Sequence, residues 1–340
     1  MTFDPVQLHR DLRRRGEKQG FDWFKWLTLA ALTAFTLYIF LWEFGNQYSD
    51  LYKHAVIAGE FNFADPHSIT SRLAYPLWHL FVAALYQVGV PLGWAAAVVC
   101  AASKAAAYLL TRRYLVVTLE GRIAPALATL CALLILLVTP IRIPGFNDGV
   151  YRGVGSPTVW HNPTQLTVLV TALLAVPYLM HCWYAFEAAR PTAGARAMLP
   201  WRKVCALAAL LVLSLSAKPT FIQALIPAAA VFFLVQWIRY PQNWRYFVQI
   251  ILAFLPAVAY FLLQYLYYTG VVVPYTSGVE FGATLAGAWG SLRGMLLMAA
   301  FPLVALALSY RRDAPPDHMV RLTLLMAVFA VLEAMFFRET

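Results

Sequence analysis

The chain is organised as long hydrophobic runs separated by shorter polar segments. An α-helix needs about 17 to 25 apolar residues to cross roughly 30 Å of hydrocarbon. Within lipid the backbone must satisfy its own hydrogen bonds, so such runs are helical. The sequence therefore predicts about nine transmembrane helices. They cover residues 24–44, 93–111, 123–142, 165–186, 202–217, 220–238, 245–268, 291–309 and 319–337.

A tenth apolar run, residues 74–91, is ambiguous by hydropathy and is assigned from the positive charges. Lysine and arginine favour the cytoplasmic ends of transmembrane helices. If 74–91 crosses the membrane, every later basic segment faces outward; if it does not, these segments share the side of the N-terminus. We therefore expect 74–91 to be a juxtamembrane or re-entrant helix at the outer face. The basic segments are 10–18, 112–113, 190–203, 239–245 and 311–321.

These assignments predict an all-α polytopic membrane protein with a single transmembrane domain over residues 1–340. The basic segment 1–23 lies in the cytoplasm, and the run 24–44 lacks a signal-peptidase site and is expected to be a signal anchor. The predicted location is the bacterial inner membrane, with most polar residues on the outer face. The larger outer segments are 45–92, which contains juxtamembrane helices, 143–164 and 269–290.

Composition supports this class and excludes two others. The chain is 61% hydrophobic and 12% charged, which would leave large exposed apolar patches on a soluble domain. The formal net charge of +10 could indicate nucleic acid, but the basic residues flank the predicted spans, where they orient the protein in the bilayer. The lipid bilayer is therefore the expected partner, and nucleic acid is not.

The first outer segment contains the most chemically suggestive residues. Asp50 and His54 are four positions apart, so in a helix they project from one face. A carboxylate and an imidazole placed in this way can act as a general base and its orienting partner. Alternatively, Asp50 begins an interfacial helix and pairs with His54. His67 and His79 are further candidate substrate contacts. Binding of a divalent metal also remains open, because Asp50, His54, His67 and His79 are available as ligands, although they match no recognised ligand spacing.

The second outer segment, 143–164, is rich in glycine, which allows its backbone to approach a ligand closely. Trp160 could stack on a sugar ring or belong to the interfacial aromatic belt. His161 and Asn162 offer hydrogen bonds, although Asn162 followed by proline and threonine is also a good helix start. Arg152 is a candidate phosphate ligand.

Lys218 occupies a short turn between two predicted spans at the outer boundary. A cation there could hold a lipid-linked phosphate at headgroup depth, or it could simply extend toward the headgroups. Glu280, in the last outer segment, is a weaker candidate for substrate binding.

Taken together, these features resemble the GT-C superfamily of membrane glycosyltransferases, in particular uncharacterised bacterial members. The resemblance covers about residues 24–240 and includes the order of one span, a long outer loop and an acidic residue near the start of that loop. Four short motifs contribute to it: Ser49-Asp50-x-x-x-His54, Tyr75-Pro76-Leu77-Trp78-His79, Trp160-His161-Asn162-Pro163-Thr164 and Lys218-Pro219-Thr220.

The resemblance implies transfer of a sugar from a polyprenyl-phosphate-linked donor to a glycan or lipid acceptor on the outer face, with inversion at the sugar. Asp50 would be the general base and His54 would orient it. The donor phosphate would be bound by Lys218, Arg152 and His161, and the substrates by Trp160, Asn162, His67, His79 and Glu280.

The sequence also departs from the family pattern. No second acidic residue accompanies Asp50, which puts a metal-dependent mechanism in doubt, and no cofactor is assigned. Relatives commonly continue beyond a span such as the last one here, so a chain truncated at Thr340 is one expectation.

Three other functions remain open. A transporter or flippase for lipid-linked substrates predicts essential charges within the bilayer and on both faces, whereas the polar residues here concentrate on one face. An O-antigen-type polymerase or ligase predicts essential outer-loop arginines, for which this chain offers chiefly Arg72, Arg142 and Arg152. A non-catalytic scaffold would tolerate loss of Asp50, His161 and Lys218.

Overall fold

In the computed structural model, the regular structure of the described residues is helical apart from one antiparallel pair of three-residue strands, β1 (Val279–Phe281) and β2 (Phe337–Glu339). The structure describes residues 22–70, 75–119, 123–137, 162–268, 279–281, 289–290, 292–294, 296, 304, 307 and 317–339.

Within these residues, six helices are long and apolar enough to cross a membrane. The chain is therefore an all-α polytopic membrane protein, as the hydrophobic runs predict, and these helices coincide with six of the nine predicted spans. They are α2 (Trp23–Phe44), α6 (Leu92–Thr118), α8 (Pro163–Ala193), α10 (Pro219–Arg239), α11 (Trp244–Tyr268, preceded by the 3₁₀ turn Pro241–Asn243) and α13 (His318–Phe336).

The other three predicted spans differ in outcome. The run 202–217 forms α9 (Trp201–Ala217), whose 17 residues rise about 26 Å, slightly less than the hydrocarbon thickness. The run 123–142 forms α7 (Pro125–Leu137), which has 13 described residues. The run 291–309 lies largely outside the described residues.

The first predicted outer segment forms three short helices, α3 (Asp50–Gly59), α4 (Pro66–Thr70) and α5 (Leu77–Gln87). The ambiguous run 74–91 contributes only α5, whose 11 residues rise about 16 Å. Pro76 precedes this helix, and Gly89, just beyond it, has a φ of 93°, a left-handed conformation that glycine adopts without strain. A helix of this length is too short to cross a bilayer alone.

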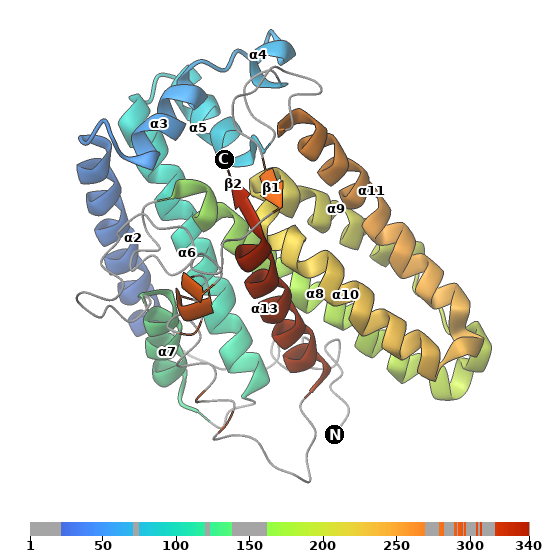
Figure 1. Cartoon of the computed structure of the whole chain (residues 1–340). Coiled ribbons are helices and arrows are strands. Elements are labelled where there is room, and N and C mark those ends of the chain that lie inside the picture. Colours follow the sequence, from blue (N-terminus) through green and yellow to red (C-terminus); the bar gives the residue numbers. More distant parts are fainter. Residues whose placement is uncertain are drawn as a thin grey trace. The chain divides into compact units, whose positions relative to one another are not determined.

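The chain divides into two compact units. Unit 1 comprises residues 1–138 and 161–218, and within it α2 and α6 pack side by side, α8 packs on α6 and α9 packs on α8 (Figure 1). Unit 2 comprises residues 139–160 and 219–340, and within it α10 packs against α13.

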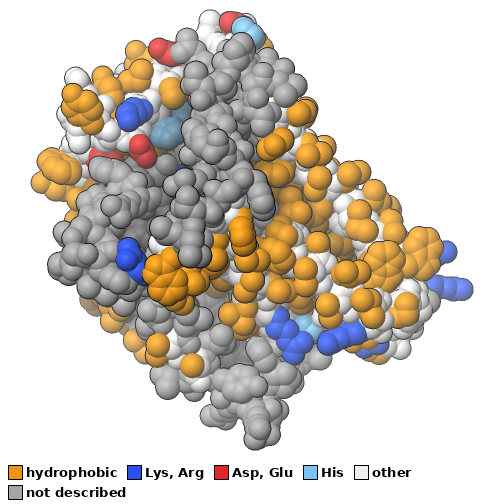
Figure 2. All heavy atoms as spheres, in the orientation of Figure 1, with side chains coloured by type: hydrophobic (Ala, Val, Ile, Leu, Met, Phe, Trp, Pro, Cys, Tyr) orange, Lys and Arg blue, Asp and Glu red, His pale blue; other side chains and the backbone are white. Residues whose placement is uncertain are grey.

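The outer surfaces of the long helices are those expected of a protein in lipid. Hydrophobic side chains cover much of the face in view (Figure 2). Separately, the exposed large apolar residues of α11 include Ile251, Leu255 and Leu262. In unit 1, exposed tryptophans lie near both helix ends: Trp42 and Trp94 at one end, and Trp23, Trp26 and Trp201 at the other. Tryptophan at both interfaces is typical of membrane-spanning helices.

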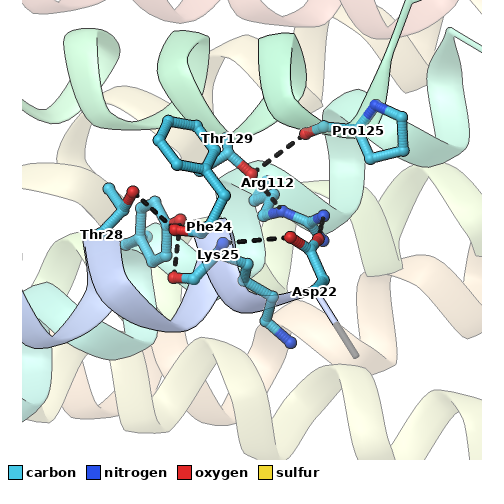
Figure 3. Close-up of polar contacts among 8 residues, drawn as sticks. Asp22, Phe24, Lys25, Thr28, Arg112, Pro125 and Thr129 are labelled. Atoms are coloured by element: carbon cyan, nitrogen blue, oxygen red, sulfur yellow. Dashed lines mark hydrogen bonds and ion pairs between the residues drawn. The ribbon is translucent and has the colours of Figure 1, made fainter. Parts of the chain in front are cut away.

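A polar network fixes the end of unit 1 at which α2 begins (Figure 3). Asp22 caps α2 by accepting a hydrogen bond from the Lys25 amide at 3.1 Å, and its carboxylate forms an ion pair with Arg112 of α6. Nε of Arg112 also donates to Oγ1 of Thr129 in α7 at 2.8 Å. Three helices are thereby tied together at this end, and the candidate site lies at the opposite end.

Candidate functional site

The candidate site lies where α2 ends and α6 begins, beside α3 and α5 (Figure 1). α2 and α6 approach closely there because Gly93 has no side chain: a Cβ atom at that position would lie 2.6 Å from Cδ1 of Phe44. The Phe44 ring also packs on the Tyr52 ring of α3, with centroids 5.4 Å apart. These contacts hold the start of α3 against the last turn of α2.

Ser49 starts α3 and thereby places Asp50. Its hydroxyl accepts a hydrogen bond from the Tyr52 amide and donates one to the Glu43 carbonyl, both at 3.1 Å. Asp50 is the first residue of the helix, where the positive end of the helix dipole stabilises a carboxylate. The expectation that Asp50 begins a helix is therefore correct, and its carboxylate is half-buried.

His54 is one turn further along α3, and its hydrogen-bond partner is His79 of α5. Nδ1 of His54 lies 2.9 Å from Nε2 of His79. The sequence offers Asp50 as the partner of His54, but in the structure Asp50 acts on this ring through its charge. The histidine pair therefore joins two helices that are adjacent in space and far apart in sequence.

Aromatic packing holds His79 in place. Its side chain is fully buried, with its ring 5.2 Å from that of Trp78 and 6.0 Å from that of Phe61 between centroids. The side chain of Gln87, at the end of α5, donates to the Phe61 carbonyl at 2.8 Å. α5 and the segment that follows α3 are thus fastened together around the imidazole.

Lys218 reaches the same place from the end of α9. Because proline disfavours helical geometry in the residue before it, Pro219 ends α9 at Ala217, and Lys218 is extended with φ of −170° and ψ of 136°. Its ammonium acts electrostatically on His54. Asp50, His54, His79 and Lys218, which we call the Asp50 cluster, therefore gather in unit 1 from three separate elements.

The electrostatics of the cluster keep both histidines neutral. Burial, and then the charge of Lys218, lower the pKa of His54 to about 4, although Asp50 acts in the opposite direction. Burial and the neighbouring His54 ring lower the pKa of His79 well below its ordinary value. A neutral imidazole offers one N–H donor and one lone pair, so each ring can both donate and accept a hydrogen bond near neutral pH.

This electrostatic arrangement predicts a pH-dependent stability. The pKa of His54 is near 6.5 in the unfolded chain and about 4 in the folded protein. Between these two pH values the unfolded chain binds more protons, so acid destabilises the fold. Above pH 6.5 the free energy of unfolding is not reduced by His54. By pH 5 protonation of His54 in the unfolded chain reduces it by roughly 2 kcal/mol. Thermal unfolding in lipid nanodiscs at pH 7.5 and pH 5 should show this loss, and His54→Gln should reduce it. An equal loss in His54→Gln would contradict the prediction.

Other predicted site residues lie elsewhere or outside the described residues. The side-chain oxygen of Asn162 accepts from the backbone amide and hydroxyl of Thr164, at 3.2 and 2.7 Å, so it caps α8, the second of the two roles that the sequence allows. His67 is exposed on α4. Glu280 belongs to β1 of unit 2, in register with Arg338 of β2. Three residues are outside the described residues: Arg152, Trp160 and His161.

Glu43, in the last turn of α2, was not expected at the site. It is half-buried and lies within electrostatic range of Asp50. The signal available in the sequence is an acidic residue at the end of an apolar run, seven positions before Asp50. Among the residues whose positions are described, no three His, Cys, Asp or Glu side chains gather closely enough to hold a metal ion.

Comparison of the chain with protein-family models, with curated proteins and with solved structures returns no match.

Proposed function

We propose that the protein is a membrane glycosyltransferase that moves a sugar from a polyprenyl-phosphate-linked donor to a glycan or lipid acceptor. The observation that supports this most directly is the Asp50 cluster, in which a half-buried carboxylate and a lysine ammonium both act on His54. Transfer from a sugar phosphate needs a base for the acceptor hydroxyl and a positive charge for the departing phosphate. The GT-C-like order of motifs supports the same assignment.

In the proposed reaction the acceptor hydroxyl gives its proton to the Asp50 carboxylate while its oxygen attacks the anomeric carbon of the donor sugar. The bond between that carbon and the phosphate oxygen breaks, and the polyprenyl phosphate leaves with the bonding electrons. Lys218 stabilises the negative charge that develops on this leaving group. Attack opposite the leaving group inverts the anomeric configuration. Because this is a single displacement, one general base and one cation suffice to catalyse it.

The depth of the cluster suits a lipid-linked donor. Lys218 lies between the end of α9 and the start of α10, and exposed Trp42 and Trp94 lie near the same end of unit 1. Tryptophans of this kind lie at the level of the lipid headgroups, where the phosphate of a polyprenyl carrier also lies. We propose about nine spans with a cytoplasmic N-terminus, which puts the cluster at the outer face of a bacterial inner membrane.

Binding of the carrier lipid tests the donor class. Undecaprenyl phosphate added to the protein in phosphatidylcholine nanodiscs should raise its thermal stability, by about 2.7 kcal/mol at a hundredfold excess over Kd. Lys218→Gln should lose most of this stabilisation, whereas Lys53→Gln, which removes an exposed lysine of α3, should retain it. No stabilisation of the wild type, or the same loss in both variants, would argue against a polyprenyl phosphate ligand.

A further inference from the structure

A polar contact joins α8 and α9 at the end of unit 1 opposite the Asp50 cluster. Nζ of Lys203, in the first turn of α9, lies 3.1 Å from Nε2 of His181 on α8. The two helices pack side by side (Figure 1), and both side chains are half-buried. Neither residue takes part in the proposed reaction, so the contact needs an explanation of its own.

The contact lies close to the depth at which hydrocarbon gives way to lipid headgroups. His181 is about 27 Å along α8 from Pro163, at 1.5 Å per residue. This distance is close to the hydrocarbon thickness of roughly 30 Å. Trp201, two positions before Lys203, is exposed, and tryptophan concentrates at this level of the membrane. The polar groups of the contact are therefore within reach of headgroup phosphates.

The ammonium of Lys203 is held in place and keeps unused hydrogen-bond donors. An ammonium has three N–H groups and no lone pair, so the ring of His181 is the acceptor and occupies one of them. Among the described residues Lys203 forms no ion pair with an acid. A lysine that merely extends toward the headgroups has no fixed position, whereas this one is fastened to a neighbouring helix.

A hydroxyl group and a second cation flank the ammonium. Tyr178 is one turn before His181 on α8, and the centroids of the two rings are 6.0 Å apart. Within the described part of the chain the Tyr178 hydroxyl has no hydrogen-bond partner. Arg202, the residue before Lys203, is exposed. The groups gathered around His181 are thus hydrogen-bond donors, two of them positively charged.

The start of α9 adds to this positive charge. Its first turn contains Arg202 and Lys203 and no acidic residue, and Pro200 supplies no side-chain cap. Basic side chains at this end of a helix are opposed by the helix dipole, which favours an anion there. An anion from outside the chain would offset both the dipole and the two cations. The place therefore suits a phosphate group.

We propose that Tyr178, Arg202 and Lys203 bind the phosphate of an anionic phospholipid, with His181 holding the Lys203 ammonium in position. Anionic headgroups lie at this depth and attract basic residues. The acyl chains would run along the exposed side of α9, which includes Cys205 and Leu213. This lipid site does not depend on the proposed function, and the proposed topology puts it in the cytoplasmic leaflet.

The test is thermal unfolding of the full chain in phosphatidylcholine nanodiscs that contain increasing fractions of phosphatidylglycerol. A ligand that binds only the folded protein raises its unfolding midpoint, so the wild-type midpoint should rise and then level off. Lys203→Gln and Tyr178→Phe should each weaken the apparent affinity about tenfold, the effect of one hydrogen bond to a charged group. A wild-type midpoint that does not respond to phosphatidylglycerol would refute the proposal.

Arg113→Gln is the matched control for charge. It removes an exposed cation near the end of α6, with the same change in net charge as Lys203→Gln, and should keep the wild-type affinity. Tyr178→Phe retains the aromatic ring, so its midpoint without phosphatidylglycerol should match that of the wild type. An equal loss of affinity in Arg113→Gln, or full affinity in both site variants, would show attraction by general surface charge and overturn the site.

Glycerol phosphate distinguishes a lipid from a soluble anion. It has the phosphate of the headgroup without the acyl chains, and at millimolar concentration it should leave the midpoint of the wild type in pure phosphatidylcholine unchanged. Stabilisation by glycerol phosphate that is lost in Lys203→Gln would identify a site for a soluble phosphate and would overturn the assignment to a lipid.

Discussion

Asp50→Asn should reduce the turnover of a polyprenyl-phosphate-linked sugar by about 10²- to 10⁴-fold, the usual contribution of a general base. Asparagine is nearly the same shape and can still begin α3 after the Ser49 cap, so the fold and donor binding should persist. The loss should appear in kcat, measured as polyprenyl phosphate released per minute in nanodiscs, because the proton transfer belongs to the chemical step.

Asp65→Asn provides the matched control for this substitution. Asp65 is an exposed carboxylate before α4, where it accepts a hydrogen bond from the His67 amide at 3.0 Å, and asparagine can make the same contact. The kcat of Asp65→Asn should stay within about twofold of wild type, as expected for an exposed position that belongs neither to the core nor to a buried polar network. Equal activity of the Asp50 and Asp65 variants would show that another group is the base, and Glu43 would then be tested next.

Lys218→Gln should lower kcat by about 10²- to 10³-fold, the range seen when one group that stabilises a developing anion is removed. If the ammonium binds the donor phosphate as proposed, it does so before transfer as well, so affinity for the donor should fall too. Lys218→Arg keeps the charge but changes its shape, so it should retain an intermediate rate. Initial rates with a labelled donor give both parameters.

The lysine prediction has a control in Lys53→Gln, which removes an exposed charge close to the same histidine. Exposed charges interact weakly through water and salt, so Lys53→Gln should keep most of the activity. If instead Lys53→Gln is as inactive as Lys218→Gln, the general field of the region rather than a phosphate contact at Lys218 is responsible.

Much of the fold follows from hydrophobic run length, because a helix in lipid must be continuous and apolar. The runs that became α2, α6, α8, α10, α11 and α13 were predicted within a few residues at most boundaries. The ends of α6 and α8 are the exceptions, because each helix runs seven residues beyond its predicted end, to Thr118 and not 111 and to Ala193 and not 186. Polar residues at a helix end cost little, so hydropathy does not mark where such a helix stops.

The site divides in the same way between local and non-local information. The Asp50–His54 spacing and the break at Lys218 before Pro219 are local patterns, and the sequence contains both. The partner of His54 is 25 residues away on another helix, and it is the tertiary packing of α3 and α5 that brings the two rings together. Glu43 was not predicted as a site residue for another reason. It lies at the end of an apolar run, and such a position predicts part of a membrane helix and not a catalytic or binding residue.

The measurement that tests the central claim most directly is donor cleavage by the wild-type chain. The purified protein in nanodiscs is incubated with a panel of undecaprenyl-phosphate-linked sugars, with and without a glycan acceptor, and free undecaprenyl phosphate is quantified. Release from at least one donor, strongly reduced in Asp50→Asn, is the predicted result. No release from any donor by a folded protein that binds undecaprenyl phosphate would contradict the glycosyltransferase assignment and favour a carrier-lipid transporter or scaffold.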